Sequence, residues 1–188
     1  MIEKKEDYQF YSTDKSVMRA AVSVIIINGE EIIMIKRAER KEDPWSGHIG
    51  FPGGREEKSD MLNPLKTAIR ETCEEIGIQL KESNFVRGLT PLLPDKDFKG
   101  YKLELWPFLF EVNNINNLNI DPNEVDQIIR LPLTKIVPKL DLQDREFTVL
   151  SGKKMVLPCL NLNEKHVVWG LSLMIITELN KVLLTRNQ

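Results

Sequence analysis

The chain has 188 residues, of which 41% are hydrophobic and 29% are charged. This length and composition predict a single globular domain over residues 1–188, with residues 1–16 as a peripheral segment. The formal net charge of -2 gives no general attraction to nucleic acid or to an anionic membrane, so any affinity for phosphate has to be local. The apolar runs are too short to span a bilayer, and the two cysteines lack zinc-type spacing. We therefore expect a cytoplasmic protein with no membrane segment.

Two apolar runs lie within residues 19–38, on either side of Asn28 and Gly29. An Asn-Gly pair between apolar runs is the strongest short signal for a β-hairpin. Residues 39–63 then lose all periodicity and are rich in Pro, Gly and Asp, which predicts a long ordered loop. At most one short strand is expected in it, near residues 48–51.

A helix is predicted directly after this loop. Asn63 is a favourable N-cap, and Pro64 suits the first helical position. Gly77 stands where a glycine commonly ends a helix. These signals predict a helix over residues 64–76.

The second half of the chain is predicted to contain mainly strands. An Asn-rich connection over residues 113–127 is expected to be too polar to pack, and it is a candidate border of a site. Strands are expected at residues 85–94, 102–112 and 128–133, a hairpin at residues 145–150 and 154–160 around Ser151 and Gly152, and a closing amphipathic helix at residues 167–183. The predicted fold class is α+β.

Three acids, Glu71, Glu74 and Glu75, fall near the end of the predicted helix. On a helical wheel they occupy an arc of about 100° opposite a mostly apolar face that includes Cys73, which we expect to be buried. Like charges at this spacing oppose helix formation by roughly 0.2–0.5 kcal/mol per pair. A divalent cation would turn the repulsion into ligation, because Mg²⁺ prefers carboxylate oxygens. A solvated acidic face is the alternative interpretation.

Residues 53–78, "GGREEKSDMLNPLKTAIRETCEEIGI", resemble the Nudix box, G-x5-E-x7-R-E-U-x-E-E-x-G-U, where U is a bulky aliphatic residue. The second half, "RETCEEIGI", matches closely. In the first half, Asp60 stands in place of the glutamate and nine residues separate it from Arg70, and in the second half Thr72 occupies a U position. The resemblance implies an α+β Nudix fold, a mixed β-sheet between α-helices, over most of residues 18–184.

The same resemblance implies roles for individual residues. Glu71 and Glu75 would be the principal ligands of Mg²⁺ or Mn²⁺, with Glu74 a further ligand or the group that accepts a proton from water. Arg70 would orient these carboxylates, and the carbonyl of Gly53 would face the metal. The implied enzyme is a Nudix pyrophosphohydrolase, which hydrolyses a diphosphate bond in a small nucleotide-derived substrate with these glutamates and Arg70 as catalytic residues.

Residues 35–54, "IKRAERKEDPWSGHIGFPGG", are similar to the segment before the box in coenzyme A pyrophosphatases of the Nudix family, although Asp43 stands where that group has an arginine. Coenzyme A-like compounds are the first choice of substrate. ADP-ribose, dinucleoside polyphosphates, nucleoside triphosphates and the 5′ end of RNA remain alternatives. Arg37, Gly54 and Trp45 are the candidate substrate-binding residues, although a loop tryptophan is equally suited to anchoring its own loop.

Several alternatives remain open at this stage. A Nudix-fold nucleotide-binding regulatory module would bind without turnover, and an isomerase on such a fold would need a positioned thiol. A homodimer is expected only by analogy with related chains. His48 is a proton donor or a structural residue, Trp169 is a core or a site residue, and Glu124 is a supplementary acid or a surface residue.

Overall fold

The computed structural model describes residues 8–41, 43, 45–93, 102–115, 118–149 and 152–186. The strands are β1 (Val17–Ile27), β2 (Glu31–Arg37), β3 (Ile49–Gly50), β4 (Gly53–Arg55), β5 (Phe85–Gly88), β6 (Lys102–Val112), β7 (Val125–Pro132), β8 (Leu142–Thr148), β9 (Lys154–Asn161) and β10 (Val167–Trp169), and the helices are α1 (Pro64–Ile76) and α2 (Gly170–Arg186). The predicted α+β class is confirmed.

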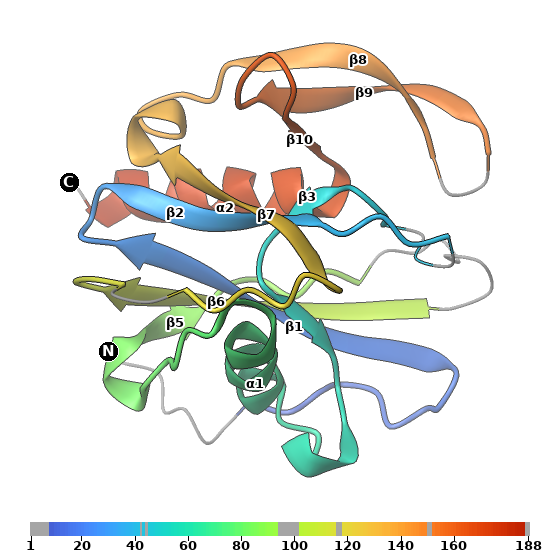
Figure 1. Cartoon of the computed structure of the whole chain (residues 1–188), viewed down its shortest axis with the longest axis vertical. Helices are drawn as coiled ribbons and strands as arrows, with labels where there is room; N and C mark the ends of the chain where they lie inside the picture. The colour runs from blue at the N-terminus through green and yellow to red at the C-terminus, as the bar shows by residue number, and fades with distance from the viewer. Residues whose placement is uncertain are drawn as a thin grey trace.

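The main sheet has seven strands and is mixed. Its central order is β3-β2-β1-β6-β5, with β4 paired to β1 and β7 paired to β2. The long strands β1 and β6 run parallel, whereas β1 and β2 form an antiparallel hairpin. Helices α1 and α2 lie on opposite faces of this sheet (Figure 1).

Alternation along β1 divides the interior into two cores, because successive side chains of a strand point to opposite faces. Val24 and Ile26 belong to the core shared with α2. Ala21 and Ile25 belong to the core shared with α1. Each apolar face of β1 thus packs against one helix, so the sheet is covered on both sides.

The local signals for the first hairpin and for α1 are confirmed. β1 and β2 pair across the turn at Asn28, and α1 spans the predicted residues. The side chain of Asn63 accepts a hydrogen bond from the Lys66 N–H, and Gly77 ends the helix at a φ of 75°. Both ends of α1 are therefore fixed by short-range chemistry that a sequence shows directly.

The predicted closing helix begins later than expected. Residues Val167–Trp169 form strand β10, which pairs with β9 in a second, three-stranded sheet of order β10-β9-β8. Val167 and Val168 are β-branched and favour a strand once a partner is available. That partner, β9, forms the predicted hairpin with β8. Ser151, one of the two residues predicted for the turn of this hairpin, lies outside the described residues.

The Asn-rich connection packs more than expected, which corrects the sequence prediction. Ile115 and Leu118 lie against the core on the α1 side. The Asn119 N–H donates to the Ile76 carbonyl, and the Asp121 N–H donates to the Glu75 carbonyl. The free carbonyls at the end of α1 recruit this polar segment, because they lack partners within the helix.

The N-terminal segment also contributes to packing within its described part. Phe10 is buried in the α1-side core, and the ring of Tyr8 contacts Phe85, Trp106 and Phe108. Among the described residues, no helix is long and apolar enough to cross a membrane.

Candidate metal and diphosphate site

Glu75 faces the sheet from α1 and is only 1% exposed. One carboxylate oxygen accepts a hydrogen bond of 2.8 Å from the Gly53 N–H on β4. This hydrogen bond gives the buried carboxylate a partner, so α1 can present Glu75 to the sheet. Cys73 is consequently exposed, which corrects the expectation that it would be buried.

Gly53 and Gly54 allow β4 to lie close to two different neighbours, β1 and α1. A Cβ atom at Gly53 would lie 2.2 Å from the Ala21 carbonyl oxygen, and its φ of 149° is strained for residues with a side chain. A Cβ atom at Gly54 would lie 2.4 Å from the carboxyl carbon of Glu71. Gly53 therefore permits the close pairing of β4 with β1, and Gly54 leaves the space that the Glu71 carboxylate occupies.

Arg70 links the acids of the box to one another. Its guanidinium donates to both carboxylate oxygens of Asp60 at 3.0 and 2.8 Å. It also donates to Glu71 at 3.0 Å and to Glu74 at 2.8 Å. Arg70 thus contacts two of the three predicted glutamates, Glu71 and Glu74, and its orienting role stays a prediction.

Asp60 is 3% exposed and serves as the buried partner of Arg70. Its carboxylate also accepts hydrogen bonds from the Thr67 hydroxyl and the Glu57 N–H. Burial acts to raise the pKa of Asp60, but the bonds from Arg70, Glu57 and Thr67 hold it below its ordinary value. Asp60 is therefore held as a buried carboxylate beside Arg70, and its correspondence to the glutamate of the box pattern stays a prediction.

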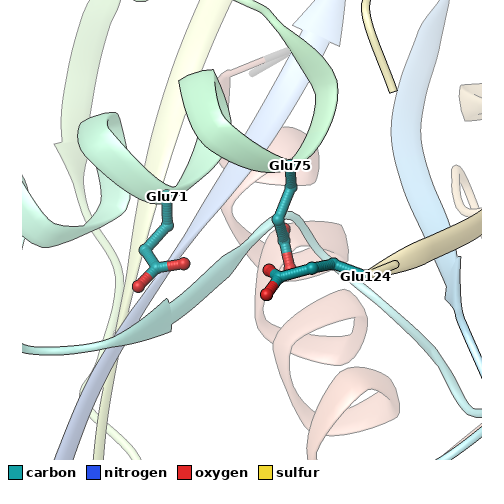
Figure 2. Close-up of side chains that lie close together, drawn as sticks. All are labelled: Glu71, Glu75 and Glu124. Atoms are coloured by element: carbon teal, nitrogen blue, oxygen red, sulfur yellow. The ribbon is translucent and has the colours of Figure 1, made fainter. Parts of the chain in front are cut away.

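Carboxylate oxygens of Glu71, Glu75 and Glu124 lie within 4.8 Å of one another (Figure 2). Glu124 stands directly before β7, and its carbonyl accepts a hydrogen bond of 2.9 Å from the Ala38 N–H. Glu74 is 57% exposed and turns its carboxylate to Arg70, so it is not part of this group of described acids. Its predicted role as ligand or base stays a prediction. Three oxygens from separate carboxylates at this spacing fit Mg²⁺ or Mn²⁺.

Burial and mutual repulsion change the protonation of the cluster. Burial raises the pKa of Glu75 to about 8, although the Gly53 N–H and the nearby Arg37 act in the opposite direction. Burial also raises the pKa of Glu71, against the influence of Arg70. The repulsion of Glu71 and Glu124 adds to the shift at Glu75. Without a cation, burial and repulsion thus disfavour the ionised forms of Glu71 and Glu75. This is expected of carboxylates that form a cation site.

The acids line a cleft of about 840 Å³, a size common for small-molecule sites. All three predicted substrate-binding residues, Arg37, Gly54 and Trp45, lie in its wall. Arg37 donates through Nε and Nη2 to one oxygen of Asp43, at 2.9 and 2.8 Å. Its Nη1 atom lies 3.7 Å from Glu75. Arg37 is therefore held at the acids and is not simply solvated.

Apolar residues of the strands and of α2 also line the cleft. They include Met18, Leu105 and Ile175. Trp169 lines the cleft between the ring of Phe147, stacked at 4.4 Å, and the ring of His48 at 5.0 Å. Burial lowers the pKa of His48. These contacts favour the structural interpretation of His48 and join the small sheet to the cleft.

Comparisons with known proteins agree with this geometry. A family model described as NUDIX domain matches residues 17–150, and the chain belongs to the Nudix family. The human and mouse proteins named mitochondrial coenzyme A diphosphatase NUDT8 are 30% and 29% identical over 74% and 79% of this chain. These matches cover 57% of the human and 68% of the mouse protein, so the chain spans little more than half of the human relative.

A solved MutT/nudix family protein from Enterococcus faecalis has a TM-score of 0.60 and 16% identity over 95% of this chain and 66% of its own. At this identity the likeness concerns the fold alone. It confirms the mixed sheet between helices that the sequence predicted.

Arg70→Ala should lower the free energy of unfolding by about 3 kcal/mol, because it leaves Asp60 buried without its charged partner. Urea unfolding followed by circular dichroism measures the loss. Arg130→Ala is the matched control, since the Arg130–Glu31 pair at 3.4 Å is solvent-exposed and should contribute under about 1 kcal/mol. Equal losses in the two variants would show that the Asp60 contact is not special.

The contribution of Glu75 to stability without metal should fall as the pH rises from about 4.5 to 8. The pKa of Glu75 is raised in the folded state to about 8 from an ordinary value of 4.5, so over this window Glu75 binds more protons in the folded protein than in the unfolded chain. The stabilisation is complete below the unfolded pKa and is lost as the pH passes through the folded pKa, by at most about 1.4 kcal/mol per pH unit.

Denaturant titrations in the presence of a chelator, repeated across this pH range, test the slope. Glu75→Gln should flatten it, whereas Glu74→Gln, on the same turn but exposed, should retain the wild-type decrease. An unchanged slope in Glu75→Gln would contradict the assignment to Glu75.

Proposed function

We propose that this protein is a Nudix pyrophosphohydrolase that uses Mg²⁺ or Mn²⁺ to cleave a diphosphate bond in a nucleotide-derived substrate. The observation that carries this proposal is the convergence of Glu71, Glu75 and Glu124 in a cleft that arginines also line. Paired acids alone could be a solvated surface, but these line a cleft and one of them is buried. The family match to residues 17–150 supports the same reaction class.

The residues of the cleft fit a divalent cation, and each would have a distinct part in the reaction. Glu71, Glu75 and Glu124 would hold the ion, while Arg70 keeps Glu71 in position and the Gly53 N–H keeps Glu75 in position. The chemistry supplied by an ion held there would be neutralisation of diphosphate oxygens and activation of the attacking water. Among the three clustered acids, Glu124 has the most exposed side chain, at 40% against 13% for Glu71 and 1% for Glu75, and it is a suitable acceptor for the proton of the attacking water.

Coenzyme A-like compounds are the first choice of substrate. The human and mouse relatives carry the name coenzyme A diphosphatase, and the segment before the box is similar to that of the same group. Asp43 stands where that group has an arginine, and in this chain it pairs with Arg37, which reduces the positive charge offered to phosphate. ADP-ribose, dinucleoside polyphosphates, nucleoside triphosphates and RNA 5′ ends are the alternatives.

Other expectations from the sequence remain proposals about the whole protein. The cytoplasmic location stays a prediction, and the human and mouse relatives are named as mitochondrial. The homodimer likewise stays a prediction. A regulatory module that binds nucleotide without turnover is disfavoured by the complete group Glu71, Glu75 and Glu124.

Purified wild-type protein with Mg²⁺ should cleave one member of a panel at its diphosphate bond, with products resolved by mass. The panel contains coenzyme A, ADP-ribose, diadenosine polyphosphates, nucleoside triphosphates and triphosphorylated RNA. Glu75→Gln should reduce kcat about a hundredfold or more, because it removes a charged ligand from the cation site. Glu146→Gln, on the exposed face of β8, is the charge-matched control and should retain activity.

Cleavage of ADP-ribose far above that of coenzyme A would overturn the substrate ranking while keeping the reaction. Tight binding of a nucleotide with no turnover across the whole panel would instead support the regulatory module.

A further inference from the structure

Each carboxylate of the three-acid cluster lies next to an arginine. The pairs are Glu71 with Arg70 at 3.0 Å, Glu75 with Arg37 at 3.7 Å, and Glu124 with Arg40 at 3.6 Å. Only the first is short enough for a hydrogen bond. The other two are loose charge pairs, and both of their arginines line the cleft.

The two cleft arginines are anchored by contacts that do not involve the cluster. Arg37 is held by the double hydrogen bond to Asp43. Arg40 donates through Nε to the Asn123 carbonyl at 2.7 Å. Each guanidinium therefore keeps its place when its acid is taken by another partner, and each has one terminal nitrogen atom near its acid, Nη1 in Arg37 and Nη2 in Arg40.

We infer that Arg37 and Arg40 exchange partners during the catalytic cycle. In the metal-free protein they lie beside Glu75 and Glu124, and they bind the diphosphate oxygens of the substrate once a divalent cation has taken the carboxylates. This inference rests on the proposed function only for the identity of the anion. The guanidinium groups suit the second role because they match phosphate oxygens in charge and geometry.

Partner exchange gives the two binding steps opposite responses to the same substitution. A cation has to compete with the arginines for the carboxylates, so removing one arginine should tighten the binding of the cation alone. A diphosphate needs the freed arginines, so the same removal should weaken its binding to the metal-loaded protein. Cation and diphosphate are thus coupled through Arg37 and Arg40, in addition to any direct contact between them.

Arg40→Gln is the principal test, because Arg40 is half-exposed and its loss leaves no buried charge unpaired. Calorimetric titration with Mn²⁺ alone should give an affinity about two- to fivefold higher than that of wild type. Titration of the Mn²⁺-saturated protein with imidodiphosphate, which resists hydrolysis, should give an affinity about tenfold lower. Arg37→Gln should act in the same directions, with thermal unfolding measured alongside because Asp43 loses its partner.

Lys36→Gln is the matched control. Lys36 precedes Arg37 on β2 and pairs with Asp126 at 2.6 Å, and it is not among the residues that line the cleft. The substitution removes the same charge a short distance away and should leave both affinities within about twofold of wild type. Arg40→Lys, which keeps the charge, should restore most of the imidodiphosphate affinity.

Weaker Mn²⁺ binding in Arg40→Gln would overturn the inference, since it would mean that Arg40 only positions the loop that carries Glu124. Unchanged imidodiphosphate affinity would overturn it as well. Neither measurement requires turnover, so the exchange can hold in a protein that hydrolyses nothing on the panel. It can equally fail in an active enzyme.

Discussion

The hydrogen bond from the Gly53 N–H to the Glu75 carboxylate is the contact on which the site depends. It places a carboxylate between α1 and the sheet, where an unpaired charge would be too costly. It also sets the rotation of α1, because the helix has to bring Glu75 to β4 instead of presenting a purely apolar face. Glu71 then comes to lie over Gly54, and the raised pKa of Glu75 follows from the same burial.

The third acid reaches the cluster through backbone pairing. Glu124 is distant in sequence from α1, yet the Asp121 N–H bonds to the carbonyl of Glu75 and the Ala38 N–H bonds to the carbonyl of Glu124. The connection before β7 is thereby tied both to the end of α1 and to the end of β2. These main-chain hydrogen bonds thus position Glu124.

Short-range signals predicted much of the fold, and long-range contacts account for what the sequence missed. The caps Asn63 and Gly77 predicted both ends of α1, because capping depends on neighbouring residues alone. The helical wheel wrongly predicted that Cys73 would be buried. It places Glu75 on the polar side of the helix, and it contains no information on the Gly53 N–H that binds this carboxylate in the folded chain. Glu124 remained ambiguous for a similar reason, because its role depends on loops that meet only in the folded chain.

The departure of this chain from the box pattern has a local structural solution. Nine residues separate Asp60 from Arg70, two more than the pattern, and Met61 and Leu62 both adopt left-handed conformations, with φ values of 55° and 61°. Such conformations cost roughly 1–2 kcal/mol each for residues other than glycine. The double hydrogen bond between Arg70 and buried Asp60 offsets this strain. The extra residues therefore form a tight turn before α1, and the aspartate still meets Arg70 where the pattern has a glutamate.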